Sequence, residues 1–588
     1  MTSAQITTAQ MSGAEILWAT LEGEGVQEVF GYPGGAILPA YDALRKFPIR
    51  HILVRHEQSA VHMADGYARA SGRVGVAIAT SGPGATNMVT GIATAMLDSI
   101  PIVCITGQVS SKVLGTDAFQ EVDITGITLP VTKHNYVVMR AEDVAPAIRE
   151  AFRIAATGRP GPVLVDITKD AQQGMAQFDF AAAAPRPYRL HPMSHSSEAD
   201  LTEAAALIAG SSRPVLLAGY GILKSGAMAQ VRTLAERAQI PVACTLLGLD
   251  SFPASHPLSL GMMGMHGEAW VNEAIQNADL LIACGMRFDD RVTGTLATYA
   301  PRAKKIHIDI DPSEINKNVR VDVALTGDLA AVLERLLPLI GEGDVEGIDG
   351  EARKGEQWLA TIRRSRGDAA VRDIKTLPDD GHLYAAHVIH DLWRATGGNA
   401  IVATDVGQHQ MWAAQYFRHE RPRAHITSGG LGTMGFALPA GIGAKIACPA
   451  KETWIIAGDG GFQMTQAELA TIAQEHLDVN IAIINNGYLG MVRQWQEFFY
   501  EKNYESSPIL SPDFALVAAA YGIPAATAHT RAEAASAIQA ARGTAGPFLI
   551  NFLVEKEDSV YPMIPTGAAL HEMIRRPSAN PLVETASD

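Results

Sequence analysis

Short apolar runs alternate with amphipathic stretches along most of this chain. The runs Val74–Ala79, Ile102–Thr106 and Val163–Ile167 have the length and the Val and Ile content that are typical of buried strands. Between such runs lie helix-like stretches, for example Ser59–Ala70 and Val144–Ala156. Alternating strands and helices predict α/β domains in which a doubly wound, mostly parallel sheet is covered by helices on both faces.

This alternation occurs in three blocks. A passage rich in Pro, Ala and Ser, residues 181–198, ends the first block, and a charged, weakly apolar stretch follows the second. The second block contains the strand-like runs Val215–Ala218, Leu280–Ala283 and Lys305–Ile310. The predicted organisation is a first domain at 1–185, a central domain at 199–340, a linker at 341–380 with one amphipathic helix around Trp358–Ile362, a third domain at 381–560, and a tail at 561–588 with little core pattern.

Composition narrows the class of protein. The chain has 588 residues, of which 47% are hydrophobic and 19% are charged, as expected for a large globular α/β enzyme of about three or four domains. The net charge of −15 argues against binding to nucleic acid or to an anionic membrane surface. No apolar run approaches the ~20 residues that a membrane-spanning helix needs.

The cysteines and the N-terminus bear on the compartment. Cys104, Cys244, Cys284 and Cys448 lie far apart, each in or beside an apolar stretch, which predicts buried free thiols in a reducing compartment. Residues 1–11 are polar and lack Lys and Arg, unlike a signal or transit peptide. We therefore expect a cytoplasmic protein.

An acid and an amide follow two neighbouring apolar runs of the third block. Asp459, in Gly458-Asp459-Gly460, follows Trp454–Ala457, and Asn486 follows Val479–Ile484. Because the carboxyl ends of parallel strands meet at one edge of the sheet, these side chains are expected to lie side by side. Their oxygens, with a phosphate, suit Mg²⁺, and the glycines let backbone N–H groups approach a diphosphate. The spacing resembles the diphosphate-binding motif of thiamine-diphosphate enzymes; the alternative is a solvent-exposed turn and an unrelated Asn.

Thiamine diphosphate also needs one buried carboxylic acid. Its 4′-amino group becomes basic enough to remove the C2 proton only if an acid shares a proton with the pyrimidine N1′. The candidate is Glu57, which follows the strand-like run Ile52–Val54. The alternative is a Glu at a helix N-terminus that interacts favourably with the helix dipole.

Several longer motifs occur in a consistent order along the chain. Three of them resemble the pyrimidine-binding domain of thiamine-diphosphate enzymes: Phe30–Ala36, His56–Gln58 and Thr80–Asn87. Four more are similar to the catalytic subunits of acetohydroxyacid synthases, also called acetolactate synthases: Gly115–Glu121, Arg287–Arg291, Gly407–Trp412 and Thr427–Gly435. The resemblance spans about residues 12–565.

The resemblance implies roles for residues around thiamine diphosphate. Glu57 would activate the cofactor, with Gln120 and Lys169 as further catalytic residues. Met434 would bend the cofactor, although a lone Met is more often a core residue, and the Gly432 carbonyl would accept a hydrogen bond from its amino group. The implied cofactor contacts are Pro83, Asn87, Val406, Gly407, Gln408, His409, Gly432, Met434, Gly458, Asp459, Gly460, Gly461, Asn486, Gly490 and Met491, and the implied Mg²⁺ ligands are Asp459, Asn486 and the Tyr488 carbonyl.

The central block is similar to the FAD-binding domain of the same family. A glycine pair follows the strand-like run that ends at Ala218, although each glycine alone could be an ordinary turn. The flavin is expected to be structural, because the implied reaction has no net redox change, and to stabilise the dimer through its binding energy. The implied FAD contacts are Arg159, Gly219, Gly221, Thr245, Leu246, Met265, His266, Gly285, Arg287, Asp289, Val292, Asp309, Ile310 and Asp328.

Four residues are implied in substrate binding. Arg291 can hold the carboxylate of a 2-oxo acid through two parallel hydrogen bonds, unless it is engaged by a neighbouring Asp. Trp495 would place an apolar wall beside the acceptor, where an extra methylene is worth ~0.8 kcal/mol, unless it is a core residue. Phe119 and Met265 complete the set. Two departures from the family pattern, Thr168 and Ser110 where Pro is expected, bear on the loops beside Lys169 and the site entrance.

The implied activity is decarboxylation of pyruvate and transfer of the hydroxyethyl unit to a second pyruvate or to 2-oxobutyrate, the first common step towards valine, leucine and isoleucine. The resemblance also implies a homodimer or homotetramer, in which the first and third domains meet across a subunit interface, and a small regulatory subunit as partner. The alternatives are another FAD-bearing carboligase, an FAD-free catabolic acetolactate synthase, and a catalytically silent subunit that senses a nucleotide or amino acid.

Overall fold

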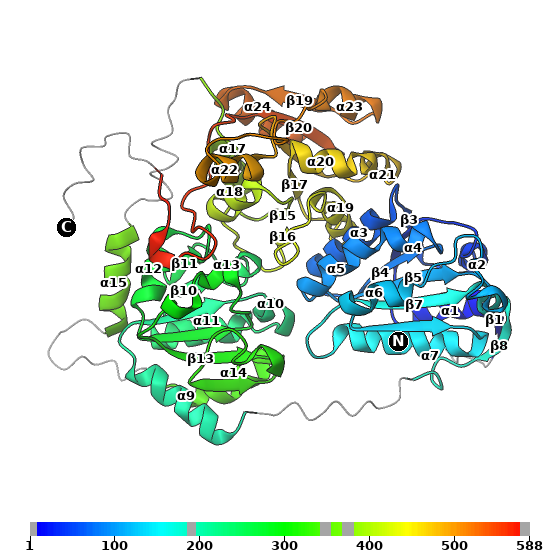
Figure 1. Ribbon diagram of the computed structural model, residues 1–588, viewed down its shortest axis with the longest axis horizontal. Coiled ribbons are helices and arrows are strands. Elements are labelled where there is room, and N and C mark those ends of the chain that lie inside the picture. Colours follow the sequence, from blue (N-terminus) through cyan, green and yellow to red (C-terminus); the bar gives the residue numbers. More distant parts are fainter. Residues whose placement is uncertain (1–8, 185–195, 342–353, 367–380, 577–588) are drawn as a thin grey trace.

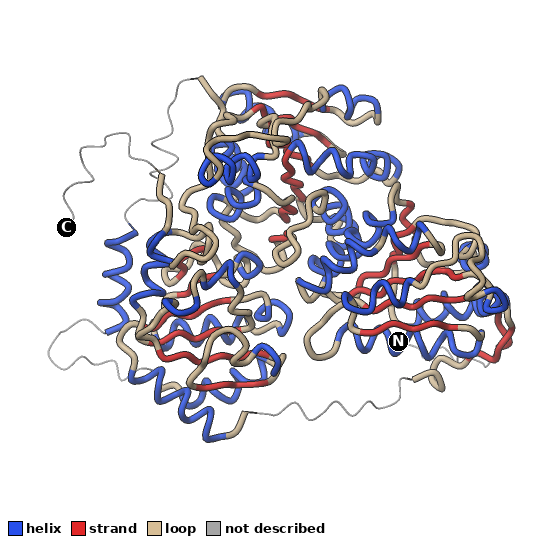
Figure 2. Tube along the Cα trace, viewed as in Figure 1, coloured by secondary structure: helices blue, strands red, loops and turns tan. Residues whose placement is uncertain are grey.

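The computed structural model describes residues 9–184, 196–341, 354–366 and 381–576. It contains three six-stranded parallel sheets, each flanked by helices (Figures 1 and 2), and a two-stranded antiparallel sheet of β1 (Ala9–Ser12) and β8 (Met175–Phe178). The predicted doubly wound α/β fold is therefore confirmed. The first sheet has the order β3-β2-β4-β5-β7-β6. Its strands are β2 (Glu28–Gly31), β3 (Arg50–Leu53), β4 (Gly75–Ala79), β5 (Ile102–Gln108), β6 (His134–Val138) and β7 (Val163–Thr168).

The third sheet repeats the order of the first. It runs β16-β15-β17-β18-β20-β19, so that in both domains the strands, numbered within the domain, lie in the order 2-1-3-4-6-5. The sheet order reverses between strands 1 and 3 in each case, and such a switch point leaves a crevice at the carboxyl ends of the strands. The strands are β15 (Ile401–Thr404), β16 (His425–Thr427), β17 (Thr453–Gly458), β18 (Asn480–Asn485), β19 (Ala525–Ala528) and β20 (Phe548–Leu553).

The central sheet has a different order, β11-β10-β9-β12-β13-β14. Numbered within the domain this is 3-2-1-4-5-6, the arrangement of dinucleotide-binding folds, with the switch point between β9 and β12. The strands are β9 (Pro214–Ala218), β10 (Val242–Cys244), β11 (Ser259–Met262), β12 (Leu280–Cys284), β13 (Lys304–Asp309) and β14 (Val323–Thr326).

Helices cover both faces of each sheet. In the first domain they are α1 (Gly13–Gly23), α2 (Leu38–Leu44), α3 (Glu57–Ser71), α4 (Pro83–Asn87), α5 (Val89–Leu97), α6 (Ile124–Thr128), α7 (Val144–Ala156) and α8 (Lys169–Gln173). In the central domain they are α9 (Glu198–Gly210), α10 (Gly221–Ser225), α11 (Met228–Ala238), α12 (Ala269–Asn277), α13 (Asp290–Thr293) and α14 (Leu329–Leu336). In the third domain they are α17 (Ala385–Thr396), α18 (Gln408–Tyr416), α19 (Ala437–Ala447), α20 (Asp459–Thr465), α21 (Leu469–Gln474), α22 (Gly490–Phe499), α23 (Phe514–Ala520) and α24 (Arg531–Gly543). No helix in these described ranges is long and apolar enough to cross a bilayer.

The first and third domains pack through α3 and α19, which follow the second strand of their respective sheets (Figure 1). A Cβ built on Gly66 of α3 would lie 2.0 Å from the Ala440 carbonyl oxygen, and one built on Gly443 of α19 would lie 1.9 Å from that of Met63. Each helix therefore needs glycine where it meets the backbone of the other, and the pairing is reciprocal. This contact fixes how the two domains sit in one chain.

Two segments outside the three predicted blocks pack against the central domain. The amphipathic helix expected around Trp358–Ile362 is α15 (Lys354–Arg366), and both named side chains lie in the central core. The expectation that residues after 560 carry little core pattern is wrong for residues 561–576, since Ile564 and Leu570 are buried in the same core. Their apolar positions are separated by turns, so neither helical nor strand periodicity reveals them. The domain boundaries themselves stay predictions.

Candidate cofactor and substrate site

The acid and the amide of the third domain lie at adjacent strand ends, as the sequence predicts. β17 pairs with β18 up to Gly458, opposite Ile484; Asp459 starts α20, and Asn486 follows β18. One Asp459 carboxylate oxygen, Oδ2, accepts hydrogen bonds from the Gly487 N–H at 3.1 Å and the Ser511 hydroxyl at 2.8 Å. Burial raises the pKa of Asp459, against these hydrogen bonds, which lower it. A buried carboxylate of this kind gains from a cation beside it.

A cavity of about 50 Å³ lies at this sheet edge. Asn486 donates to the Gln408 side-chain oxygen at 3.3 Å, and a Cβ built on Gly490 would lie 2.3 Å from that oxygen, so the backbone approaches closely here. The cavity lining includes most of the cofactor residues predicted in the third domain: Val406, Gly407, Gln408, His409, Met434, Gly458, Asp459, Gly460, Gly461, Asn486, Tyr488, Gly490 and Met491.

The donor atoms at this edge fit magnesium and a diphosphate. Asp459 offers a carboxylate, Asn486 an amide oxygen and Tyr488 a backbone carbonyl, which are hard oxygen ligands that leave positions for phosphate and water. No group of three His, Cys, Asp or Glu side chains able to hold a metal occurs in the described part of the chain. A soft-metal site such as structural zinc, with its Cys and His ligands, does not match this set.

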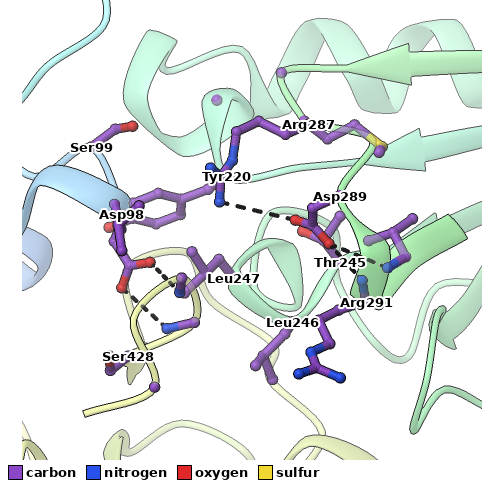
Figure 3. A pocket seen from close by; sticks show the side chains of 18 of the residues that line it. Asp98, Ser99, Tyr220, Thr245, Leu246, Leu247, Arg287, Asp289, Arg291 and Ser428 are labelled. Atoms are coloured by element: carbon purple, nitrogen blue, oxygen red, sulfur yellow. Dashed lines mark hydrogen bonds and ion pairs between the residues drawn. The ribbon is translucent and has the colours of Figure 1, made fainter. Parts of the chain in front are cut away.

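A second cavity of about 740 Å³ lies where loops of all three domains meet (Figure 3). It opens at the central switch point, because Gly221 follows β9 and Gly285 follows β12, and a Cβ on Gly221 would lie 2.6 Å from the Gly285 Cα. Thirteen of the fourteen predicted FAD residues line it: Arg159, Gly221, Thr245, Leu246, Met265, His266, Gly285, Arg287, Asp289, Val292, Asp309, Ile310 and Asp328. Gly219 lies behind this wall, where its N–H donates to the Cys284 carbonyl.

The polar groups around this cavity are partly paired with one another. Arg159 of the first domain donates to the carboxylates of Asp311 and Glu314, at 3.2 and 2.8 Å, and so ties the first domain to the central one. Burial raises the pKa of Asp309 to about 6, and burial lowers the pKa of His266 to about 4. The lining thus combines a neutral imidazole, carboxylates at strand ends and apolar side chains, a composition that fits a large dinucleotide.

The predicted substrate residues Arg291, Met265 and Trp495 line the same cavity. Arg291 lies 3.7 Å from Asp290, and both side chains are more than half exposed, so this ion pair contributes little stability and leaves the guanidinium available. One guanidinium N–H of Arg291 also contacts the Met265 sulfur at 3.2 Å. Trp495 on α22 is partly buried and contacts the Phe499 ring, so it is not a fully buried core residue.

The two cavities share part of their lining. Val406, Gly407, Met434 and Met491 contribute to both, and Gly432 lines the larger one. The predicted diphosphate site is therefore next to the predicted substrate and flavin residues. This juxtaposition arises within a single chain, because loops of the third and central domains face each other.

The predicted residues of the first domain form a separate group. Glu57, the first residue of α3, accepts a hydrogen bond from the Asn87 side chain at 2.9 Å, and Pro83 begins the same short helix α4 that Asn87 ends. A Cβ on Gly82 would lie 2.9 Å from that of Gln120, whose φ of +60° places it in the left-handed region. Glu57 is also at a helix N-terminus, so the alternative role of this Glu is compatible with the geometry.

This first-domain group does not line either cavity in the described chain. Phe119 is 88% exposed, and Lys169 begins α8 without a contact that joins it to Glu57. Thr168, at the position where Pro was expected, caps α8 by accepting the Ala171 N–H at 3.4 Å. The departure from the family pattern thus has a local role as a helix N-cap.

Three buried carboxylates near the site were not predicted. Asp405 follows β15 and accepts the Gly435 N–H at 2.9 Å; burial raises the pKa of Asp405 to about 7. Asp98 at the end of α5 and Glu468 after α20 accept backbone N–H groups from the opposite domain. Only Asp405, directly after a strand, carried a sequence signal; an Asp or Glu in a helical stretch gives none.

Comparisons with known proteins agree with this arrangement. Residues 11–127 match the N-terminal thiamine pyrophosphate-binding domain of thiamine pyrophosphate enzymes, residues 201–336 the central domain and residues 405–552 the C-terminal thiamine pyrophosphate-binding domain. An acetolactate synthase of Mycobacterium bovis is 46% identical over 597 residues, covering 99% of this chain and 94% of the relative. The acetolactate synthase large subunit of Corynebacterium glutamicum is 48% identical, covering 95% and 89%. A probable acetolactate synthase large subunit of Methanocaldococcus jannaschii is 44% identical, covering 98% and 97%.

Proposed function

This chain belongs to the thiamine pyrophosphate enzyme family, among its acetolactate synthase large subunits, and we propose that it decarboxylates pyruvate and transfers the hydroxyethyl unit to a second pyruvate or to 2-oxobutyrate. The products are acetolactate and acetohydroxybutyrate, at the first common step towards the branched-chain amino acids. The observation that carries the proposal is the shared wall, around Met434, between the diphosphate cavity and the cavity that holds Arg291 and Trp495.

The residues of the third domain would hold the cofactor. Asp459, Asn486 and the Tyr488 carbonyl would bind Mg²⁺, and through it the diphosphate, while Met434 and the Gly432 carbonyl would support the rings. When bound, thiamine diphosphate would supply a nucleophilic carbon and a place for the negative charge that decarboxylation leaves.

Glu57 would hold the activating proton. Its carboxyl group would share a proton with the pyrimidine N1′. Asn87, whose side-chain amide donates to the Glu57 Oε2 at 2.9 Å, would orient the carboxyl group. Arg291 would hold the carboxylate of the acceptor 2-oxo acid, and Trp495 would contact its alkyl group. A pocket from which water is excluded would disfavour proton transfer from solvent before the acceptor is bound.

FAD would occupy the part of the larger cavity at the central switch point. Support comes from the strand order 3-2-1-4-5-6 and from the close approach of Gly221 to Gly285 there. Since the reaction needs no net electron transfer, the flavin would act by binding and shaping the site. The four free thiols suit a reducing compartment such as the cytoplasm.

Two copies of the chain would form the working unit. Glu57 does not line the cavity that Met434 and Asp459 border in the described chain, so the proton-handling group of one copy would complete the cofactor site of another. The dimer or tetramer, and a small regulatory subunit, are proposed from the family to which the large-subunit relatives belong.

The proposal is tested by assaying the purified protein with thiamine diphosphate, Mg²⁺ and FAD on mixed pyruvate and 2-oxobutyrate. We expect a yellow protein that forms acetolactate and acetohydroxybutyrate, with one CO₂ released for each molecule of either product. Activity of a colourless protein without FAD would favour the FAD-free catabolic alternative, and CO₂ with acetaldehyde alone would contradict the carboligase.

A further inference from the structure

Two buried carboxylates make reciprocal contacts between the first and third domains. Glu468 lies after α20, in the connection between β17 and β18 of the third domain, and one of its carboxylate oxygens accepts the N–H groups of Arg55 and His56 at 2.9 and 3.1 Å. These two residues immediately precede Glu57. The third domain thus fixes the backbone from which the activating Glu of the first domain extends.

The first domain makes the matching contact on the third. Asp98 lies between β4 and β5, and its two oxygens accept the N–H groups of Gly429 and Gly430 at 3.1 and 2.7 Å (Figure 3). Two residues further on begins the segment of Gly432 and Met434. In both domains the carboxylate comes from the connection between strands 3 and 4, and in both it binds the residues after strand 2 of the other domain.

Both carboxylates are held in place by further hydrogen bonds. Asp98 is 2% exposed and its Oδ2 also accepts from Arg69 at 2.8 Å, while Glu468 is 1% exposed and its second oxygen accepts from Thr471 at 2.7 Å. Charge-assisted hydrogen bonds to backbone N–H groups in a buried place are strong and directional. Carboxylates fixed in this way set the position of the loops that they bind.

We propose that Glu468 and Asp98 are positioning residues: Glu468 aligns Glu57 with the cofactor pyrimidine, and Asp98 aligns the loop of Gly432 and Met434. Neither touches a reacting atom, and the proposal rests on the proposed function. Its physical basis is that misplacing a catalytic group by about 1 Å can cost on the order of 10²-fold in rate. The loop that contains Met434 is held at both ends. Asp98 binds the loop at Gly429 and Gly430, and Asp405 accepts the Gly435 N–H.

The pattern of acceptors predicts which substitutions are tolerated. In Glu468→Gln the amide oxygen can still accept both N–H groups, and the amide NH₂ can donate to the Thr471 hydroxyl, which in turn can donate to the Leu53 carbonyl 3.3 Å away. In Asp98→Asn no such exchange is possible, because both oxygens accept from N–H donors. Glu468→Gln should therefore behave as wild type, whereas Asp98→Asn and Glu468→Ala should not.

The test measures three quantities on the full protein: the exchange rate of the cofactor C2 proton with D₂O, the dissociation constant of thiamine diphosphate, and the melting temperature. We expect Glu468→Ala to slow exchange by about 10²-fold at saturating cofactor with little change in affinity, and Glu468→Gln to restore it. Glu468→Asp, which keeps the charge but withdraws the oxygens by one methylene, should show an intermediate loss if Glu468→Ala does not fold. Asp98→Asn should weaken cofactor binding as well as slow exchange.

Asp279→Ala is the matched control. Asp279 also accepts two consecutive backbone N–H groups, those of Ser212 and Arg213 at 2.8 Å each, but within the central domain. It should lower the melting temperature and leave exchange unchanged. Wild-type exchange in folded Glu468→Ala and Asp98→Asn, or equal loss in Glu468→Gln and Glu468→Ala, would overturn the proposal. Absence of exchange in the wild-type protein would instead count against the proposed function.

Discussion

The first and third domains have the same strand order and pack through equivalent helices, yet they offer different chemistry at the same edge of the sheet. The third domain presents Asp459, Asn486 and glycine N–H groups, which suit a metal and a diphosphate. The first domain presents a Glu57–Asn87 pair, which suits acid–base chemistry. Each of the two domains has a crevice at the carboxyl ends of its strands. The residues that follow the strands decide whether that crevice binds the diphosphate or activates the cofactor.

The two domains also differ in how complete their sites are. The third-domain residues converge on a cavity in one chain, whereas Glu57 and its neighbours do not reach that cavity. The third-domain residues, the anchoring half of the site, could bind a cofactor but could not activate it without the activating half, Glu57 and its neighbours. We therefore propose that the third domain binds the cofactor, that the first domain activates it, and that the two functions meet in one site when a second copy of the chain is present.

The largest effect is expected from the anchoring half. Asp459→Ala removes the only carboxylate among the proposed Mg²⁺ ligands, so the diphosphate would face no cation and the protein should retain no thiamine diphosphate after desalting. Cofactor content and activity are the measurements. Ser511→Ala, which removes one hydrogen bond to Asp459 but no ligand, serves as the control with a smaller loss. Wild-type affinity of Asp459→Ala in the presence of a chelator would show that the metal assignment is wrong.

The activating half should give the opposite pattern. Glu57→Gln removes the shared proton while it preserves shape, so turnover should fall by a large part of the ~10²–10⁴-fold typical of a positioned acid or base. Affinity for thiamine diphosphate should stay near wild type, as measured by titration. Glu22→Gln, an exposed change on α1, is the control. Near-normal turnover of Glu57→Gln would show that the first domain does not activate the cofactor through Glu57.

The contact between the two domains can be tested by stability. Gly66→Ala and Gly443→Ala each place a Cβ about 2 Å from a carbonyl oxygen of the facing helix, at 2.0 and 1.9 Å, so each should cost ~1–3 kcal/mol of unfolding free energy. Gly543→Ala, at the end of α24 with nothing within 4 Å of its Cβ, should be neutral or stabilising. Denaturant melts of the three variants are the measurement. Equal stability of all three would mean that α3 and α19 do not pack closely in solution.

The smallest effect concerns the substrate side of the larger cavity, which Trp495 lines. Trp495→Leu removes a flat apolar surface beside the acceptor, so it should lower the ratio of acetohydroxybutyrate to acetolactate by the equivalent of ~1–3 kcal/mol at most, with overall activity kept. The same change should weaken planar heterocyclic inhibitors that stack at the site entrance. Phe498→Leu, on the same helix but outside the cavity lining and with its ring against Tyr561, is the control. An unchanged ratio would assign the acceptor preference to another residue.

Much of the scaffold follows directly from the sequence. The predicted run Val163–Ile167 differs from β7 by one residue, and the predicted stretch Val144–Ala156 coincides with α7, because strong apolar periodicity marks buried elements. Asp459 and Asn486 could be paired because parallel strands end at one edge. In contrast, the packing of residues 561–576 on the central domain leaves no periodic signal.

The carboxylates of Asp98 and Glu468, in contrast, carry no signal in the sequence. Asp98 accepts hydrogen bonds from N–H groups that are 331 and 332 residues away in the sequence. Glu468 accepts from N–H groups that are 412 and 413 residues away. Nothing local distinguishes them from exposed helical acids. Their role depends on how α3 meets α19, and that is a tertiary property.

The most direct test of the central claim, that Glu57 of one copy and Asp459 of another serve one cofactor, is co-expression of the Glu57→Gln and Asp459→Ala chains. Each variant alone should be inactive. A mixed dimer would combine both changes in one site and leave the other intact, so random pairing should restore about a quarter of wild-type acetolactate formation. If both residues instead serve a site within one chain, every site carries a lesion, and co-expression would restore nothing.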